Sequence, residues 1–431
     1  MLIHETKTPP LGWNSYDCYA ESINEEQANA NLDAFIEKLK PFGFEYFCLD
    51  AGWYADGDQV HHMDMLRHGQ IRHMNIDEYG RFIPSPVNFP HTLRALADRC
   101  HANGIKFGVH IMRGMPLMAL EKNTKIKGTN YHARDIYDPD NFCTWCKYCV
   151  ATKPDHPGTL AYYKSVVEYL ANDLTVDYIK LDDVTEHPDH IRLFAEAVNS
   201  VERSILLGLS PGNEIWEGNI KTYEEFTNMF RITPDIWDND RNNQIKLERW
   251  HQCENITPGK CWLDLDMLPL GGLQVAMPAN PDKDFNKHLG FARQSRMTPQ
   301  GKRVMMSIMA LSASPLIFGG DLPTTPQSDF DYVLDPEVLK CNQNGVVGKR
   351  IFLSRHIDIR KAESKTEPGH GWLGIFNVNQ DDRRVRLSSR ELGFEKTPVL
   401  YDIWNKENIY IDPDGTVELF IPAYGGFFLK Y

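Results

Sequence analysis

Residues 163–184 read YKSVVEYLANDLTVDYIKLDDV, and this stretch decides the fold. In its first half apolar residues recur at i, i+3, i+4 and i+7, which predicts a helix with one buried face. These residues are Tyr163, Val166, Val167 and Leu170. The short apolar run 178–184 follows and predicts a strand that ends at Asp182 and Asp183. A strand alternates its faces, so Lys180 and Asp182 point to the same side. On its own this pair fits a buried ion pair as well as a functional site.

The same order of helix and apolar strand recurs along the chain. Helical spacing at 32–39, 93–100 and 191–198 precedes strand-like runs at 46–50, 105–112 and 205–212, and further apolar runs lie at 11–14, 230–232, 261–267 and 315–321. Alternating helices and continuous apolar strands are typical of an α/β protein with a parallel sheet covered by helices. About eight such strands predict a (β/α)8 TIM barrel. An open doubly wound sheet is the competing fold, but the glycine-rich phosphate loop typical of it is missing.

The pattern changes after about residue 335. Before it, Thr298 and Pro299 are typical of a helix N-cap and first helical position. After it, short β-rich runs alternate with turn signals such as the Asp-Pro-Asp-Gly sequence at 412–415. We therefore predict a barrel domain over 1–335 and a C-terminal antiparallel β-sandwich domain over 336–431.

Composition restricts the class of partner. The chain has 431 residues, 42% apolar and 24% charged, and a formal net charge of −13. That charge argues against nucleic acid or an anionic membrane surface as a partner and favours a neutral substrate. The first residues do not read as a secretory signal, and no run is long enough for a spanning helix, so we expect a cytoplasmic protein. Whether it forms a homo-oligomer is left open.

Nine cysteines are present, and three of them lie close together in the segment CTWCKYC. Cys143, Cys146 and Cys149 have a spacing that zinc sites use, but a structural zinc site needs four ligands. We therefore predict no metal. A zinc hydrolase that uses this segment and a nearby histidine remains the alternative.

Polar residues follow the predicted strands at their carboxyl ends, where the catalytic groups of TIM barrels lie. We expect them to surround one pocket. They are Asp50, His110, Lys180, Asp182, Asp183, Ser210, Arg231, Asp235, Asp264 and Asp266. Carboxylates held at different pKa values by neighbouring cations and by burial are the groups that hydrolyse glycosides. Trp13 and Trp53, near the first two strand ends, would offer apolar faces to a sugar ring.

Several motifs together resemble glycoside hydrolase family 27, the α-galactosidase and α-N-acetylgalactosaminidase family. They are TPPLGWNSYD, YFCLDAGW, FGVH, VDYIKLDD, FRITPDIWD, DLDML and ALSASPLIFGGDL, followed by the C-terminal β domain. The matches run in order from residue 8 to the C-terminus. The resemblance implies a retaining exo-α-glycosidase that works through a covalent glycosyl-enzyme and needs no cofactor.

The resemblance also implies roles for individual residues. Asp182 in the K-x-D motif corresponds to the nucleophile, with Lys180 beside it. Asp235, four residues after Arg231, corresponds to the acid/base, and Asp238 and Asp240 are lesser candidates. The implied substrate-binding residues are Trp13, Asp50, His110, Lys180, Ser210, Arg231 and Asp266.

Three departures from the family pattern bear on the sugar. Asp50 is followed by Ala51, where the family has a second aspartate that holds the far hydroxyls of galactose. His110 stands where a tyrosine is usual. Ser210 and Gly212 are small where α-galactosidases carry a glutamate and a bulky residue.

The expected function is α-galactosidase, with α-N-acetylgalactosaminidase next because Ser210 and Gly212 are small. Ala51 keeps β-L-arabinopyranosides and α-glucosides open as substrates. The expected partner is thus a carbohydrate, an α-galactoside or an α-N-acetylgalactosaminide. A barrel that binds a glycan without cleaving it is the alternative from another class.

Overall fold

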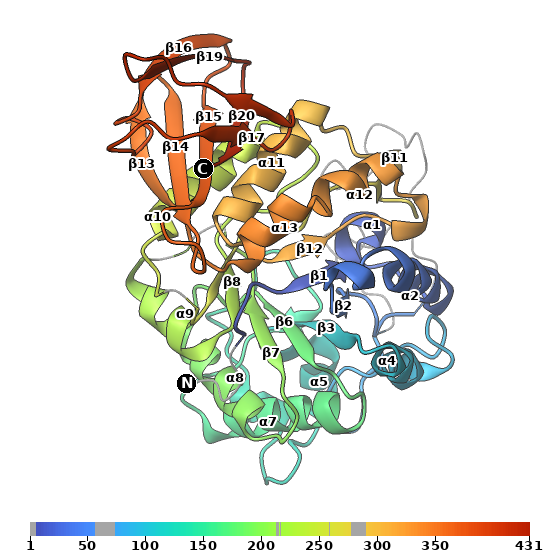
Figure 1. Ribbon diagram of the computed structural model, residues 1–431. Coiled ribbons are helices and arrows are strands. Elements are labelled where there is room, and N and C mark those ends of the chain that lie inside the picture. Colours follow the sequence, from blue (N-terminus) through green and yellow to red (C-terminus); the bar gives the residue numbers. More distant parts are fainter. Residues whose placement is uncertain (1–5, 57–73, 213–214, 216, 258, 277–289) are drawn as a thin grey trace.

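The computed structural model describes residues 6–56, 74–212, 215, 217–257, 259–276 and 290–431 (Figure 1). Eight parallel strands form its central sheet, in the order β12-β1-β2-β3-β6-β7-β8-β9. Their bounds are Leu11–Asn14 for β1, Tyr46–Leu49 for β2, Lys106–Met112 for β3, Tyr178–Asp182 for β6, Leu206–Leu209 for β7, Met229–Arg231 for β8, Trp262–Asp264 for β9 and Leu316–Phe318 for β12. Each strand predicted for the barrel is confirmed.

The sheet closes between β9 and β12. Leu268, just after β9, forms a parallel bridge with Phe318. Its backbone N–H donates to the carbonyl of Ile317 at 2.8 Å, and its own carbonyl accepts from Gly319 N at 3.0 Å. The carboxyl ends of all the strands therefore surround one axis, and the predicted TIM barrel is confirmed.

Helices cover the outside of the barrel, and their starts follow local chemistry. Asn24 and Gln27 form a reciprocal capping box at the start of α2, and the Thr298 side chain accepts from Gly301 N at the start of α11, with Pro299 as the first helical residue. The predicted helices are confirmed as α2 (Glu25–Lys38), α4 (Thr92–Ala102), α7 (Pro157–Asn172), α8 (Pro188–Asn199) and α11 (Pro299–Leu311). The other helices are α1 (Tyr16–Tyr19), α5 (Leu117–Lys122), α6 (Ala133–Ile136), α9 (Ile220–Phe226), α10 (Asn242–Cys253), α12 (Gln327–Val333) and α13 (Pro336–Gln343), with 3-10 turns η1 (Lys40–Phe42), η2 (Glu217–Asn219) and η3 (Leu322–Thr324). Among the described residues, none of these helices has the length and apolar content that crossing a bilayer requires.

The C-terminal part is an antiparallel β-sandwich, as predicted. One sheet has the order β13-β14-β15-β20-β17-β18 and the other pairs β16 with β19. The bounds are Lys349–Ser354 for β13, Ile357–Glu363 for β14, Gly371–Asn377 for β15, Arg383–Ser388 for β16, Leu400–Asp402 for β17, Glu407–Ile409 for β18, Thr416–Ile421 for β19 and Gly426–Lys430 for β20. Leu373, Leu387 and Leu419 belong to a buried cluster between the two sheets.

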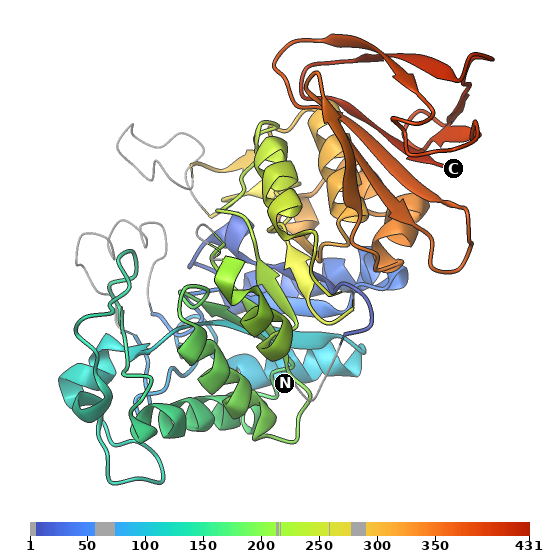
Figure 2. The same cartoon turned by 90° about the vertical axis from the view of Figure 1, so that its left-hand side faces the viewer.

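The larger C-terminal sheet packs against α10 and α11, which lie between it and the barrel (Figures 1 and 2). Its residues Trp372, Phe376 and Phe428 join the core of the barrel. The intervening helix α13 also buries Val338 and Cys341 in that core. The two parts therefore share one continuous apolar interface.

A buried arginine lies in this interface. Arg360 of β14 is fully buried and donates to both carboxylate oxygens of Asp358, at 2.8 and 2.9 Å. It also donates to Glu254 at the end of α10, at 3.0 Å, and its guanidinium lies 4.4 Å from the ring centre of Trp250. One cation thus joins the β-sandwich to a barrel helix.

Two short antiparallel strand pairs lie outside the central sheet. β4 (Met115–Pro116) pairs with β5 (Cys149–Val150), and β10 (Gly272–Leu273) pairs with β11 (Arg293–Gln294). The first of these pairs joins the cysteine-containing segment to the chain just after β3.

Candidate active site

A cavity of about 220 Å³ lies at the carboxyl ends of the barrel strands. Most of the polar residues predicted from strand ends line it: Asp50, His110, Lys180, Asp182, Arg231, Asp235 and Asp266. The other lining residues are Tyr16, Asp17, Glu21, Ala51, Trp145, Tyr148, Pro211, Ile236, Trp237 and Met267. The cavity therefore combines several carboxylates with two cations and aromatic walls.

Asp182 ends β6 and faces the cavity. Its Oδ2 lies 3.2 Å from His110 Nε2, and its Oδ1 accepts from the backbone N–H of Asp183 at 2.8 Å. Burial alone would raise the pKa of Asp182. The hydrogen bond with His110 and the positive charges of Lys180 and Arg231 outweigh burial and hold this pKa below its usual value. Asp182 is thus an ionised carboxylate, the state that a nucleophile requires.

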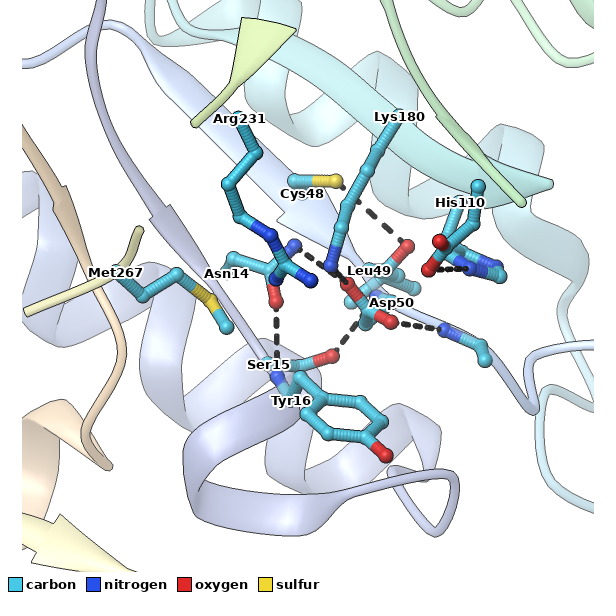
Figure 3. Close-up of polar contacts among 12 residues, drawn as sticks. Asn14, Ser15, Tyr16, Cys48, Leu49, Asp50, His110, Lys180, Arg231 and Met267 are labelled. Atoms are coloured by element: carbon cyan, nitrogen blue, oxygen red, sulfur yellow. Dashed lines mark hydrogen bonds and ion pairs between the residues drawn. The ribbon is translucent and has the colours of Figure 1, made fainter. Parts of the chain in front are cut away.

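Asp50 ends β2 and is bound on both oxygens. Its Oδ2 accepts from Lys180 Nζ at 2.7 Å and from Asn14 Nδ2 at 2.8 Å, while Oδ1 accepts from the backbone N–H of Ala51 at 2.8 Å. Figure 3 shows Lys180 reaching Asp50 from one side, with Tyr16 on the other side. Burial would raise the pKa of Asp50, but Lys180 lowers it below the usual value. A fixed, charged carboxylate is a strong acceptor for sugar hydroxyls.

Asp235 lies on the loop after β8, and its side chain is 43% exposed. Arg231 Nη2 donates to Asp235 Oδ1 at 2.6 Å, and Nη1 donates to Asp266 Oδ1 at 3.2 Å. Asp266 in turn accepts from the backbone N–H of Ile236 at 2.7 Å. This network fixes the loop while leaving Asp235 in contact with solvent, the position that a proton-exchanging group needs.

Behind this network lies Asp264. Burial and then the negative charge of Asp266 raise its pKa to about 6. Asp264 accepts from the backbone N–H of Asp266 at 2.8 Å and so helps to set the loop that follows β9.

No family model matches the chain. The structure resembles that of a family 27 β-L-arabinopyranosidase from Geobacillus stearothermophilus with a TM-score of 0.88 and 30% identity, covering 99% of this chain and 96% of that one. The chain belongs to glycoside hydrolase family 27.

Curated relatives agree with this assignment at lower identity. Alpha-galactosidase 3 from Arabidopsis thaliana is 23% identical over 429 residues, covering 97% of this chain and 80% of the relative. An α-N-acetylgalactosaminidase from Mus musculus is 22% identical over 386 residues, covering 82% of this chain and 74% of the relative. The resemblance predicted from the sequence is confirmed, and the protein is a retaining glycoside hydrolase.

Asp183, which was expected to surround the pocket, lies outside the cavity of this family 27 barrel, as do the lesser acidic candidates Asp238 and Asp240. Asp183 turns away and accepts from Arg113 at 2.8 and 3.1 Å. Asp238 accepts from Arg293 at 2.6 Å and Arg296 at 3.0 Å, and Asp240 accepts from the backbone N–H of Thr298 at 3.0 Å. Each holds a loop, and none of the three is a lining residue.

Trp13 and Ser210 correct the sequence analysis, because neither lines the cavity. Trp13 is fully buried, stacks on Phe47 with ring centres 4.5 Å apart, and donates from Nε1 to the carbonyl of Gly320 at 2.8 Å. Its face is therefore covered by protein and is closed to a sugar ring. Ser210 is 2% exposed, and its neighbour Pro211 takes the expected place in the lining.

Packing also explains Trp53, which was expected to contact the sugar ring, and Gly212, whose small size was expected to leave room for an acetamido group. Trp53 is fully buried and donates to the backbone carbonyl of His110 at 2.9 Å, so it supports the β3 strand and does not contact the cavity. A side chain on Gly212 would overlap the backbone of Arg231 and Thr233. The small size of residue 212 is thus explained by close backbone packing.

Two aromatic residues that were not predicted from the sequence form one wall of the cavity. Trp145 and Tyr148 belong to the CTWCKYC segment, whose three cysteines are buried in the supporting core. Within the described part of the chain, no group of three or more metal-binding side chains could hold an ion. The available signal was one aromatic residue before Cys146 and another before Cys149, in a segment between β3 and the nucleophile strand β6.

Proposed function

We propose that this family 27 protein hydrolyses non-reducing terminal glycosides of the galacto configuration with retention, with Asp182 as nucleophile and Asp235 as acid/base. The observation that carries the proposal is the contrast between these two carboxylates. Asp182 is held ionised against the cavity wall, whereas Asp235 lies half-exposed at the solvent side beside Arg231. Different environments for two carboxyl groups assign the acid and the nucleophile.

Each residue then has a chemical step. Asp182 attacks the anomeric carbon, and the bond to the leaving oxygen breaks as Asp235 donates its proton to that oxygen. Asp235 then takes a proton from water, which attacks the anomeric carbon and releases Asp182. Two displacements on one carbon return the original configuration. His110 and Lys180 stabilise the Asp182 charge that reappears in the second step.

The size of the cavity supports exo action. About 220 Å³ is below the roughly 300 to 1,000 Å³ of most ligand pockets, so one sugar ring fills it. Asp50 and Lys180 are placed to bind hydroxyls of that ring, and the Asp235 side leads to solvent, where the aglycone would lie. The α-D-galactoside is the reference substrate.

A second candidate substrate is the β-L-arabinopyranoside. It has the ring hydroxyls of an α-D-galactoside but lacks the hydroxymethyl group. Ala51 places a methyl group in the cavity wall next to Asp50, so residue 51 offers no hydrogen bond to an exocyclic hydroxyl. The structurally similar Geobacillus enzyme is a β-L-arabinopyranosidase, which supports this candidate. The α-N-acetylgalactosaminide has less support, since Gly212 is explained by backbone packing.

A panel of nitrophenyl glycosides tests the proposal. The wild type, Asp182→Asn and the matched control Asp183→Asn are assayed on the α-galactoside, β-L-arabinopyranoside, α-N-acetylgalactosaminide and α-glucoside. We expect turnover of a galacto-configured member, its loss in Asp182→Asn, and its persistence in Asp183→Asn. Proton NMR of the first-formed product should show the substrate's anomeric configuration. Binding without turnover, or equal activity in Asp182→Asn, would refute the proposal.

A further inference from the structure

Glu21 is a carboxylate in the cavity wall that the mechanism above does not use. It lies just after α1, is 4% exposed and lines the cavity. A carboxylate in the wall of a sugar-sized cavity is a charged acceptor that a hydroxyl of the bound ring can reach.

The backbone places Glu21 beside Ala51, the residue that follows Asp50 in the cavity wall. Gly52 follows Ala51, and a side chain at residue 52 would overlap the carbonyl group and Cα of Glu21. Gly52 also has a φ of +97°, which disfavours other residues. Glu21 and Ala51 therefore belong to the same part of the wall, and this close approach depends on glycine at residue 52.

Two phenols form a chain that ends at Glu21. Tyr54 donates its hydroxyl to Tyr148 at 3.0 Å, and Tyr148 donates to Glu21 Oε1 at 3.4 Å. Burial first, and then nearby negative charges that include Glu21, raise the pKa values of Tyr54, Tyr148 and Tyr16. These phenols stay protonated, so those of Tyr54 and Tyr148 act as donors that orient the carboxylate as an acceptor.

We propose that Glu21 determines specificity at the far end of the sugar by accepting a hydrogen bond from the 6-hydroxyl of a galactoside. It supplies from the loop after α1 the acceptor that Ala51 lacks at the end of β2. This inference rests on the proposed function, because it needs a galacto-configured ring whose anomeric carbon faces Asp182. It predicts that the exocyclic hydroxyl, and not only the ring hydroxyls, contributes to turnover.

The test compares three substrates that differ only at carbon 5: the nitrophenyl α-D-galactoside, its 6-deoxy analogue, and the β-L-arabinopyranoside. For each, kcat/KM is measured in the wild type, Glu21→Gln and Glu21→Ala. We expect the ratio of galactoside to 6-deoxy analogue to fall about tenfold or more in Glu21→Ala, and less in Glu21→Gln, which keeps an acceptor without charge. Glu25→Gln, which alters a glutamate that pairs with His91 on the surface, is the matched control.

A second variant separates recognition from folding. Glu21→Ala combined with Ala51→Asp moves the carboxylate to the neighbouring position and should restore the ratio. Galactose binding to Asp182→Asn, measured by calorimetry with and without Glu21→Gln, gives the same comparison without turnover. If the wild type cleaves the substrates but neither the ratio nor the binding depends on residue 21, the inference fails alone. If the wild type cleaves none of the three, the proposed function fails with it.

Discussion

Replacing His110 with phenylalanine tests how the nucleophile is kept charged. The His110 ring is 2% exposed, and its Nε2 lies 3.2 Å from Asp182 Oδ2. A hydrogen bond to a charged group contributes about 1.5 to 3 kcal/mol. If that contribution is realised in the transition state, kcat/KM falls roughly 10- to 150-fold. Phenylalanine keeps most of the ring volume, so the change isolates the polar contact.

The loss should depend on pH. Burial pushes the pKa of Asp182 up, while His110, Lys180 and Arg231 push it down and prevail. Without the His110 hydrogen bond, burial is opposed by Lys180 and Arg231, so the pKa of Asp182 rises. Because the ionised form is the active one, the acidic limb of the kcat/KM profile moves to higher pH, and the loss is greater in acid than at neutral pH.

The assay is kcat/KM on the best nitrophenyl glycoside across about pH 4 to 8. His110→Gln keeps a donor and should retain more activity than His110→Phe. His101→Phe alters a similar pair, in which His101 Nε2 lies 2.7 Å from Asp177 outside the cavity, and should follow the wild-type profile. A His110→Phe enzyme with wild-type kcat/KM and an unmoved acidic limb would refute the reasoning.

Three further predictions concern other parts of the molecule. Asp235→Ala should lower kcat/KM about 10²- to 10⁴-fold on alkyl glycosides and far less on nitrophenyl glycosides, because nitrophenolate leaves without taking up a proton. Added azide should raise the turnover of this variant. Equal losses on the two substrate classes would contradict the role of Asp235 as acid/base. Asp264 has a folded pKa of about 6, above its usual 3.8, so its stabilising contribution is complete below pH 3.8 and is lost as pH rises through 6. Above pH 6, Asp264→Asn should therefore raise the free energy of unfolding by up to about 3 kcal/mol, and the melting temperature should rise with it. In acid neither quantity should change, and a change that is the same at every pH would count against this reasoning. Arg360→Met should lower the free energy of unfolding by about 1.5 to 3 kcal/mol in urea denaturation followed by circular dichroism, because it removes the charge-assisted hydrogen bonds to Asp358 and Glu254 while Arg350 still pairs with Asp358. Arg384→Met at an exposed pair should cost under about 1 kcal/mol, and similar costs for the two variants would argue against this reasoning.

Periodicity predicted the barrel because its strands are apolar on both faces and end at polar residues. The same rule placed Asp50, Lys180 and Asp182 at one end of the sheet. Alternation along a strand assigns a side chain to one face but does not say what covers it, which is why Trp13 was expected at the sugar and lies under Gly320 and Phe47.

Residues from loops were harder to predict. Glu21, Trp145 and Tyr148 come from segments without a period, and only the folded chain brings them to the strand ends. Gly212 shows the opposite error, since its small size suggested room for a substrate and instead reflects backbone packing. Local pattern identifies the strand-end chemistry, while the shape of the cavity depends on long-range contacts.

The Arg360 contact limits how this protein can be recombined with its relatives. Arg360 holds the end of α10, and Arg249 of the same helix donates to the backbone carbonyl of Ile232, where the loop that carries Asp235 begins. Arg249 also donates to the carbonyl of Gly212, which packs against the backbone of Arg231 and Thr233. A chimera joined at residue 335 would therefore separate the acid/base loop from one of its supports while leaving the barrel strands intact. The unit to exchange is the β-sandwich together with α10, so the modules that evolution or an engineer can swap do not coincide with the point where the sequence changes character.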